Sequence, residues 1–135
     1  MIGIDTNVLV RYIVGDDPEQ SIAASEMVER AIDREETLFI SQIVLCELVW
    51  VLSHAYRFTR AEIVNALQQL RRGAQMTIEG ADEVRRATDS YAALRGDFAD
   101  YLIAERSVAN GCSSIATFDR VLHSDQRFAA PDQVR

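Results

Sequence analysis

The sequence contains no lysine, and all 14 of its basic residues are arginine. Acids outnumber bases by 21 to 14, and the formal net charge of −7 disfavours a nucleic-acid partner. Two properties reduce that objection. Arginine binds phosphate through a planar fork of N–H donors. Two divalent cations held by acidic side chains would also add four positive charges and change the sum from −7 to −3.

Cysteine is scarce, with only Cys46 and Cys112 in the chain. The two residues match no C-x-x-C or Cys/His spacing, which argues against a disulfide scaffold. A structural zinc site needs about four ligands, and adding His54 and His123 gives a poor match to one. We interpret both cysteines as small buried residues of a protein in a reducing compartment.

Long hydrophobic runs are absent as well. No apolar run approaches the roughly 20 residues of a membrane-spanning helix, and residues 1–10 include an acid and lack the basic start of a signal peptide. The chain shows no repeat, linker or low-complexity segment, and its 48% hydrophobic and 26% charged residues are ordinary for a globular protein. We therefore expect a cytoplasmic protein without membrane association, folded as a single domain over residues 1–135.

Short β-like segments alternate with longer helix-like segments along the chain. Strands are expected at residues 2–4, 37–40, 75–78 and 113–117, and helices at 7–14, 42–55 and in the remaining intervals. Capping residues are expected before three helices, with capping boxes at Asp17/Gln20 and Thr59/Glu62 and a simple cap at Ser41. No fifth strand is evident. This alternation predicts an α/β fold with a parallel sheet covered by helices on both faces.

Acidic side chains follow two of the predicted strands. Asp5 comes directly after the first strand, and Asp119 follows the fourth. Each also has an ordinary structural interpretation, as a helix N-cap or a turn residue. Ligands of parallel α/β sheets bind beyond the carboxyl ends of the strands, so the two positions are candidates for one site.

Three further acids lie in helices. Glu47 lies in the stretch 43–52, which is otherwise apolar and predicts a helix buried nearly all round. A carboxylate there needs an arginine partner, a narrow exposed stripe or a metal ion. Asp97 and Asp100 are spaced as a helix cap and its third residue, and Asp100 is also placed to face a site.

Together these carboxylates suit a hard cation such as Mg²⁺ or Mn²⁺. Two such ions would clamp the attacking water and the leaving oxygen of a phosphodiester. The sequence offers no P-loop, nucleophilic serine or cysteine–histidine pair as a competing centre.

Several segments also resemble one protein family. The opening Ile-Gly-Ile-Asp-Thr-Asn-Val-Leu-Val of residues 2–10 resembles the start of PIN-domain proteins, and Val-Gly-Asp-Asp-Pro-Glu-Gln at 14–20 resembles their VapC-type toxins. Residues 41–52, 97–104 and 117–119 resemble the segments that carry the family's remaining acids. The resemblance covers almost the whole chain in the right order.

The resemblance implies a three-layer α/β/α sandwich with a mostly parallel sheet ordered 3-2-1-4-5. It implies endonucleolytic cleavage of RNA with Mg²⁺ or Mn²⁺ as cofactor, by the toxin of a toxin–antitoxin pair. It further implies a homodimer held near the N-terminal helices and neutralised by a small VapB-type antitoxin.

Carried over to this sequence, the resemblance makes Asp5 and Asp100 the leading metal ligands. Glu47 and Asp119 complete the acidic pocket and orient a second metal, ligand waters or the nucleophile. The third family acid is assigned to Asp100 because the apolar run that follows it matches the family.

The neighbours of these acids have accessory roles. Thr6 and Thr117 are expected to hydrogen-bond the carboxylates, and Asn7 is expected to form a further polar part of the wall of the acidic pocket. Asp97 is an accessory acid or a helix cap.

Other functions fit the residues less well. A haloacid-dehalogenase-like phosphatase needs a second aspartate two positions after the first, where this chain has Asn7, and it also needs a lysine, as a response-regulator receiver does. A DNA nuclease of the same fold stays open because the metal chemistry does not read the 2′-hydroxyl. A non-catalytic PIN module that only binds partners also stays open, although the four intact acids speak against it.

Overall fold

The computed structural model describes residues 1–134. The chain divides into two compact units, one ending at Ala81 and the next beginning at Asp82. Each unit contains parallel strands and helices, so the predicted α/β class is confirmed within each of them.

A three-stranded parallel sheet organises the N-terminal unit. Its order is β1 (Ile2–Gly3), β2 (Leu38–Ile40) and β3 (Met76–Ile78), with β2 in the centre. Every strand pair is parallel, and each connection contains helices, as parallel pairing requires. The central strand is buried at both ends, because Leu38 and Ile40 are fully covered.

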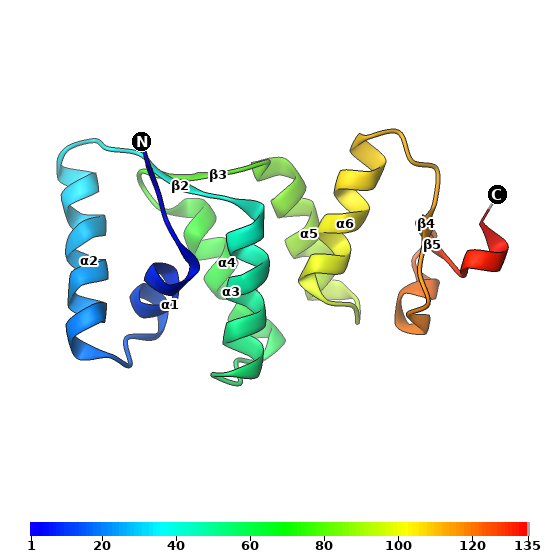
Figure 1. Ribbon diagram of the computed structural model, residues 1–135, viewed down its shortest axis with the longest axis horizontal. Helices are drawn as coiled ribbons and strands as arrows, with labels where there is room; N and C mark the ends of the chain where they lie inside the picture. Colours follow the sequence, from blue (N-terminus) through cyan, green and yellow to red (C-terminus); the bar gives the residue numbers. More distant parts are fainter. Residues whose placement is uncertain (135) are drawn as a thin grey trace. The chain divides into compact units, whose positions relative to one another are not determined.

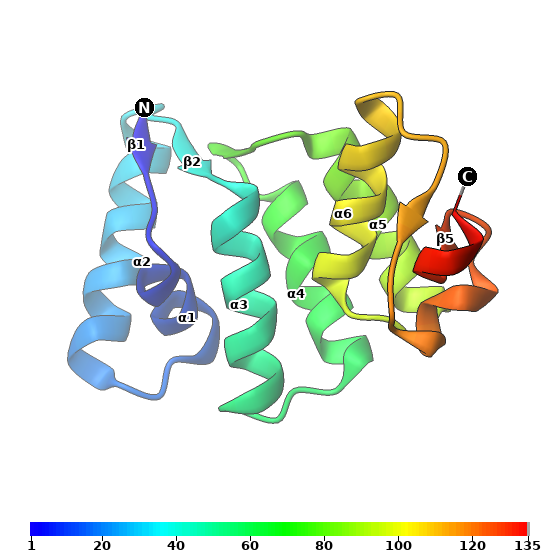
Figure 2. The same ribbon diagram turned by 45° about the vertical axis from the view of Figure 1, so that its right-hand side comes forward.

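Four helices accompany this sheet, and Figures 1 and 2 show α3 and α4 lying side by side. They are α1 (Thr6–Val14), α2 (Pro18–Asp33), α3 (Gln42–His54) and α4 (Arg60–Arg72). Three begin at a predicted cap: Asp17 accepts from the Gln20 N–H, Ser41 from the Val44 N–H, and Thr59 from the Glu62 N–H. The Thr59/Glu62 capping box is complete, so that prediction is confirmed.

The second predicted capping box is only half formed. The Gln20 side chain accepts instead from Arg11 Nε at 2.7 Å. Arg11 Nη1 also donates to Asp16 Oδ1 and to the Tyr56 hydroxyl, both at 3.1 Å. Arg11 therefore connects Asp16 and Gln20, which lie in and after the α1–α2 turn, to Tyr56 in the loop after α3.

The prediction that α3 is buried nearly all round is wrong. Ile43 is 73% exposed and Trp50 is 61% exposed, and Glu47 lies exposed between them. These residues are four and three positions apart, so they form one stripe along the helix. The alternative of an exposed stripe at Glu47 is therefore confirmed, and the burial prediction failed because apolar side chains occupy both faces of the helix.

The C-terminal unit pairs two helices with a two-stranded sheet. It contains α5 (Ala81–Ala93), α6 (Phe98–Ala109), β4 (Ile115–Ala116), the 3₁₀ turns η1 (Arg120–Ser124) and η2 (Pro131–Gln133), and β5 (Phe128–Ala129). Strands β4 and β5 are parallel. The strand β5, which the sequence did not reveal, therefore exists, and β4 is shorter than predicted.

The observed pairings give the runs 3-2-1 and 4-5 of the predicted strand order. The neighbourhood of β1 and β4, which the full order requires, stays a prediction. Each unit has its own apolar centre, with Leu9, Leu45, Leu48, Leu52, Ile63 and Leu67 in the first and Val84, Phe98, Tyr101, Leu102 and Phe128 in the second.

The structure bears on the two cysteines and on membrane-spanning helices. Cys112 is exposed and Cys46 is half-buried, so the expectation of two buried cysteines is wrong. Within residues 1–134, the helices are all too short or too polar to cross a membrane.

Candidate active site

Asp5 lies where β1 gives way to α1. The buried Ile4 donates its N–H to the Phe39 carbonyl at 2.9 Å and so fixes the strand. The next residue has an extended backbone (φ −80°, ψ 157°) and occupies the N-cap position of α1. Its carboxylate nevertheless accepts no cap hydrogen bond, so the interpretation of Asp5 as a side-chain cap is wrong.

Glu47 of α3 lies against the first residue of α1. The Thr6 hydroxyl donates to Glu47 Oε1 at 3.2 Å, which is the expected bond between Thr6 and one of the acids. Thr6 is only 6% exposed, and Leu45 and Leu48 beside the glutamate are fully buried. The N-terminal unit therefore brings Glu47 to the residue that follows Asp5.

Asn7 belongs to a different part of this unit. It lines an open hollow of about 470 Å³ between α1 and α2, together with Val8, Arg11, Gln20, Ala23, Ala24, Met27 and Arg30. Thr6, and not Asn7, is the polar residue that contacts Glu47.

Asp97 and Asp100 form the start of α6 in the C-terminal unit. Asp100 Oδ2 accepts the Asp97 backbone N–H at 2.9 Å, so this carboxylate holds the first turn of the helix. One such bond leaves the other lone pairs of the carboxylate available, because an ionised carboxylate offers about four acceptor sites. Capping and ligation are therefore compatible at Asp100.

Burial raises the pKa of the Asp100 carboxyl above its ordinary value. The hydrogen bond from the Asp97 backbone lowers it, and the negative charges of Asp97 and Asp119 raise it again. The Asp119 charge thus acts on Asp100, and the unit brings three acids into one negative field. A cation among them would remove this repulsion.

Asp119 is held by the turn between β4 and η1. Its Oδ1 accepts the Val121 N–H at 3.0 Å, and its own N–H donates to Thr117 Oγ1 at 3.1 Å. The Thr117 hydroxyl thus fixes the backbone of this acid, whereas a bond to a carboxylate was expected. His123 Nε2 lies 3.0 Å from the Thr117 carbonyl and closes the turn from the other side.

Gly96 positions the α5–α6 loop beside η1, and sequence reasoning missed it. Its N–H donates to the Tyr101 hydroxyl at 2.7 Å. A Cβ at this position would overlap the Leu122 side chain of η1 and lie 2.7 Å from the Tyr101 oxygen. The missing side chain lets the segment with Asp97 approach the segment with Asp119. The only signal was a glycine before a helix cap, which is too common to be specific.

Replacing Gly96 by alanine should therefore lower the free energy of unfolding by about 1–3 kcal/mol, as overpacking of a tight contact does. Urea unfolding of the variant would measure this loss. Gly3→Ala is the matched control, because a Cβ there meets nothing within 4 Å. Equal stabilities of the two variants would contradict this role of Gly96.

The acids in both units are the kind of donor that a hard cation prefers, because every donor is a carboxylate oxygen. His123 follows Asp119 on η1, but its Nε2 lies 3.0 Å from the Thr117 carbonyl. In the described part of the chain, no three His, Cys, Asp or Glu side chains are already arranged to hold a metal ion. The donor chemistry therefore fits Mg²⁺ or Mn²⁺.

Comparison with known proteins places this chain in a family. The model of the PIN domain matches residues 2–127, which span both units. A VapC ribonuclease of Aquifex aeolicus (strain VF5) is 26% identical over 117 residues, which cover 87% of this chain and 86% of that protein. Since the family model matches nearly the entire sequence, the chain belongs to the PIN domain family.

Proposed function

We propose that this protein is a metal-dependent endoribonuclease that acts as the toxin of a VapC-type toxin–antitoxin pair. Its relative from Aquifex aeolicus is named a VapC ribonuclease and aligns over most of both chains. The family assignment supports the same class of chemistry, since the acids of the resemblance are all present in this sequence.

The observation that carries the proposal is that the Asp5 side chain does not cap the helix that it precedes. An aspartate at a helix N-cap ordinarily satisfies a backbone N–H of the first turn. The Asp5 carboxylate does not do so, although it occupies the cap position. A carboxylate held by a rigid strand–helix junction and not used for capping is available to a ligand.

In this proposal four acids serve one metal centre. Asp5 and Asp100 are the leading ligands, and Glu47 and Asp119 complete the pocket. The bound Mg²⁺ or Mn²⁺ would activate water and neutralise charge on the scissile phosphate. Thr6 orients Glu47 through its hydroxyl, and the turn of Thr117 orients the backbone of Asp119.

The remaining features follow the same family pattern. We propose one domain over residues 1–135, with the sheet order 3-2-1-4-5 and helices on both faces. We also propose a homodimer in the cytoplasm that a small VapB-type antitoxin inhibits. The span of the family model across both units supports the single domain.

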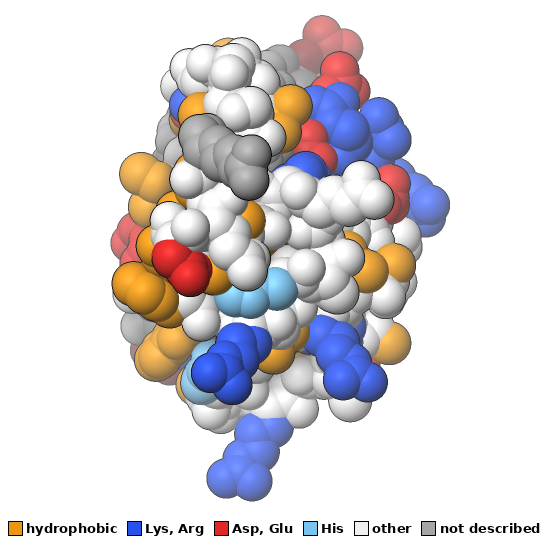
Figure 3. Space-filling model, turned by 90° about the vertical axis from the view of Figure 1, so that its right-hand side faces the viewer, with side chains coloured by type: hydrophobic (Ala, Val, Ile, Leu, Met, Phe, Trp, Pro, Cys, Tyr) orange, Lys and Arg blue, Asp and Glu red, His pale blue; other side chains and the backbone are white. Residues whose placement is uncertain are grey.

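Basic side chains next to Asp119 support a polyanionic substrate. Arg120 and His123 are both exposed on η1, and Figure 3 draws arginine and histidine side chains at the surface of the face that it shows. Arginine in such a position can bind a phosphate through two parallel hydrogen bonds. Arg11 and Arg106 are poorer candidates, because Asp16 and Glu83 already pair with them.

The test is cleavage of RNA by the purified full chain, free of antitoxin. Structured RNA and DNA of the same sequence are incubated with the protein in Mg²⁺, in Mn²⁺ and in EDTA. We expect internal cleavage of the RNA with either metal and none in EDTA. Cleavage of DNA alone would make DNA, and not RNA, the substrate. Cleavage of neither nucleic acid would favour a module that only binds partners.

A further inference from the structure

We propose that Arg127 is a positioning residue that holds the Asp119 segment against α6, the helix of Asp100. The inference rests on the proposed function, since both acids serve the metal centre there. Asp100 lies in the first turn of α6, and Asp119 lies between β4 and η1. Like charges on these two elements favour their separation, and a link between the elements would oppose it.

The first half of the link is the pair of Arg127 and Asp125. Arg127 Nε lies 3.1 and 3.2 Å from the two Asp125 oxygens, and Nη2 lies 2.7 Å from Oδ2. The Arg127 backbone N–H also donates to Asp125 Oδ1 at 3.0 Å. These contacts join the backbone and the side chain of Arg127 to the Asp125 carboxylate, and they fix the direction of the guanidinium.

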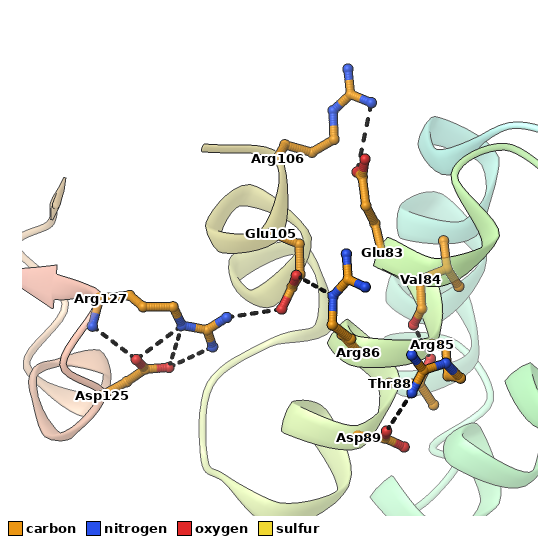
Figure 4. A network of polar contacts seen from close by, with 10 residues as sticks. All are labelled: Glu83, Val84, Arg85, Arg86, Thr88, Asp89, Glu105, Arg106, Asp125 and Arg127. Carbon is orange, nitrogen blue, oxygen red and sulfur yellow. Dashed lines mark hydrogen bonds and ion pairs between the residues drawn. The ribbon is translucent and has the colours of Figure 1, made fainter. Parts of the chain in front are cut away.

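The second half reaches across to α6. Arg127 Nη1 donates to Glu105 Oε1 at 3.0 Å, and Figure 4 shows the guanidinium spanning the space between Asp125 and Glu105. Glu105 and Asp125 are each only 12% exposed in their side chains, and Arg127 is 27% exposed. Solvent therefore screens the ion pairs of Arg127 with Glu105 and Asp125 less than it screens an ordinary surface ion pair.

The backbone of Arg127 transmits this anchor to the strands. Its carbonyl accepts the Ile115 N–H at 2.8 Å, directly before β4 and β5 run in parallel. Two residues on, the Ala129 carbonyl accepts the Thr117 N–H at 2.9 Å. Thr117 in turn holds the Asp119 N–H. A continuous series of hydrogen bonds thus leads from α6 to Asp119.

The chain offers a matched control on the same carboxylate. Arg86 of α5 donates to the other oxygen of Glu105 at 2.8 Å. Figure 4 shows Arg86 and Arg127 reaching Glu105 from opposite sides. Loss of either arginine removes one partner of Glu105, but only the loss of Arg127 releases the β4–β5 segment.

The experiment compares Arg127→Gln, Arg127→Lys and Arg86→Gln in the full chain, with Mn²⁺ as the probe. Calorimetry gives the Mn²⁺ dissociation constant, and thermal unfolding shows that each variant is folded. Arg127→Gln should weaken Mn²⁺ binding about tenfold, as loss of a residue that supports metal ligands does. Arg127→Lys should bind closer to wild type, because a lysine keeps the charge without the fork. Arg86→Gln should bind Mn²⁺ as the wild type does.

Amide exchange in the metal-free proteins supplies a second readout. The Thr117 and Val121 amides should exchange several-fold faster in Arg127→Gln than in Arg86→Gln, because their partners lie on the released segment. Equal exchange in the two variants would overturn the positioning role, as would unchanged Mn²⁺ binding in Arg127→Gln. If the wild type binds no Mn²⁺, the proposed function fails, and amide exchange alone decides the role of Arg127.

Discussion

Substitution of Asp100 by asparagine is expected to reduce the rate of RNA cleavage by at least about 10³-fold. The change keeps the shape of the side chain but removes the negative charge that a cation needs. A loss of about 4 kcal/mol of transition-state stabilisation corresponds to this factor, which is the scale expected for metal-assisted phosphodiester hydrolysis. The measurement is the single-turnover rate on a short RNA at saturating Mg²⁺.

Asp89→Asn is the matched control for this prediction. Asp89 is an exposed acid of α5 in the same unit and makes only a 3.8 Å ion pair with Arg85. Its loss should change the rate by less than about twofold, since an exposed ion pair contributes little. Similar rates for Asp100→Asn and Asp89→Asn would contradict the assignment of Asp100 to the site.

The Asp100→Asn substitution should not destabilise the protein at neutral pH. Because the folded state raises the pKa of Asp100, the ionised carboxylate opposes folding above that pKa. Asparagine removes this effect, and its amide oxygen still accepts the Asp97 N–H. Asp100→Asn should therefore unfold at an equal or higher temperature than wild type at pH 7. The difference should vanish as the pH falls through the raised pKa, where the wild-type carboxyl becomes neutral.

Phe98→Ala has the largest expected effect on stability. Phe98 is 0% exposed and packs edge-to-face on Tyr91, with ring centroids 6.3 Å apart. Truncating a buried phenylalanine removes its apolar burial and leaves a cavity, which costs about 3–5 kcal/mol. That is a large fraction of the roughly 5–15 kcal/mol that stabilises a typical domain. Urea unfolding followed by far-UV circular dichroism measures the change.

Phe118→Ala provides a control of the same chemistry. Phe118 is 88% exposed, so its removal leaves no cavity and should change stability by less than about 0.5 kcal/mol. Comparable losses in the two variants would show that Phe118 is covered in solution and that the packing described for Phe98 is incomplete.

Local signals in the sequence predicted much of the fold. The Thr59/Glu62 capping box and the Ser41 cap depend on residues three positions apart, so the chain alone specifies them. The strand β5 escaped notice because it has only two residues, Phe128 and Ala129, and no visible alternation. Its existence depends on pairing with β4, which is a non-local contact.

The candidate site was likewise predictable from the sequence only in part. The sequence predicted the acids as candidate ligands, because their positions after strands and in helices are local features. It did not distinguish a cap from a ligand at Asp5, since the same residue type and position serve both roles. In the structure the Asp5 side chain accepts no cap hydrogen bond, which removes the cap interpretation and leaves the ligand role as a proposal.

Contacts between distant residues were beyond sequence reasoning. The link from Arg127 to Glu105 joins residues 22 positions apart, and no local pattern indicates it. The Thr6–Glu47 bond joins residues 41 positions apart and was expected only from the family resemblance. The exposed stripe of α3 was one of three alternatives left open for Glu47, because apolar composition does not show which apolar residues find a partner.

Mn²⁺ binding to Asp5→Asn and Asp119→Asn tests the central proposal most directly, that these two acids serve one metal centre. Calorimetric titration of the metal-free proteins gives the affinity and the stoichiometry. Each substitution should weaken the same binding event at least about tenfold, because each removes a charge from one ligand set. Loss of binding in Asp119→Asn together with unchanged binding in Asp5→Asn would contradict a shared centre.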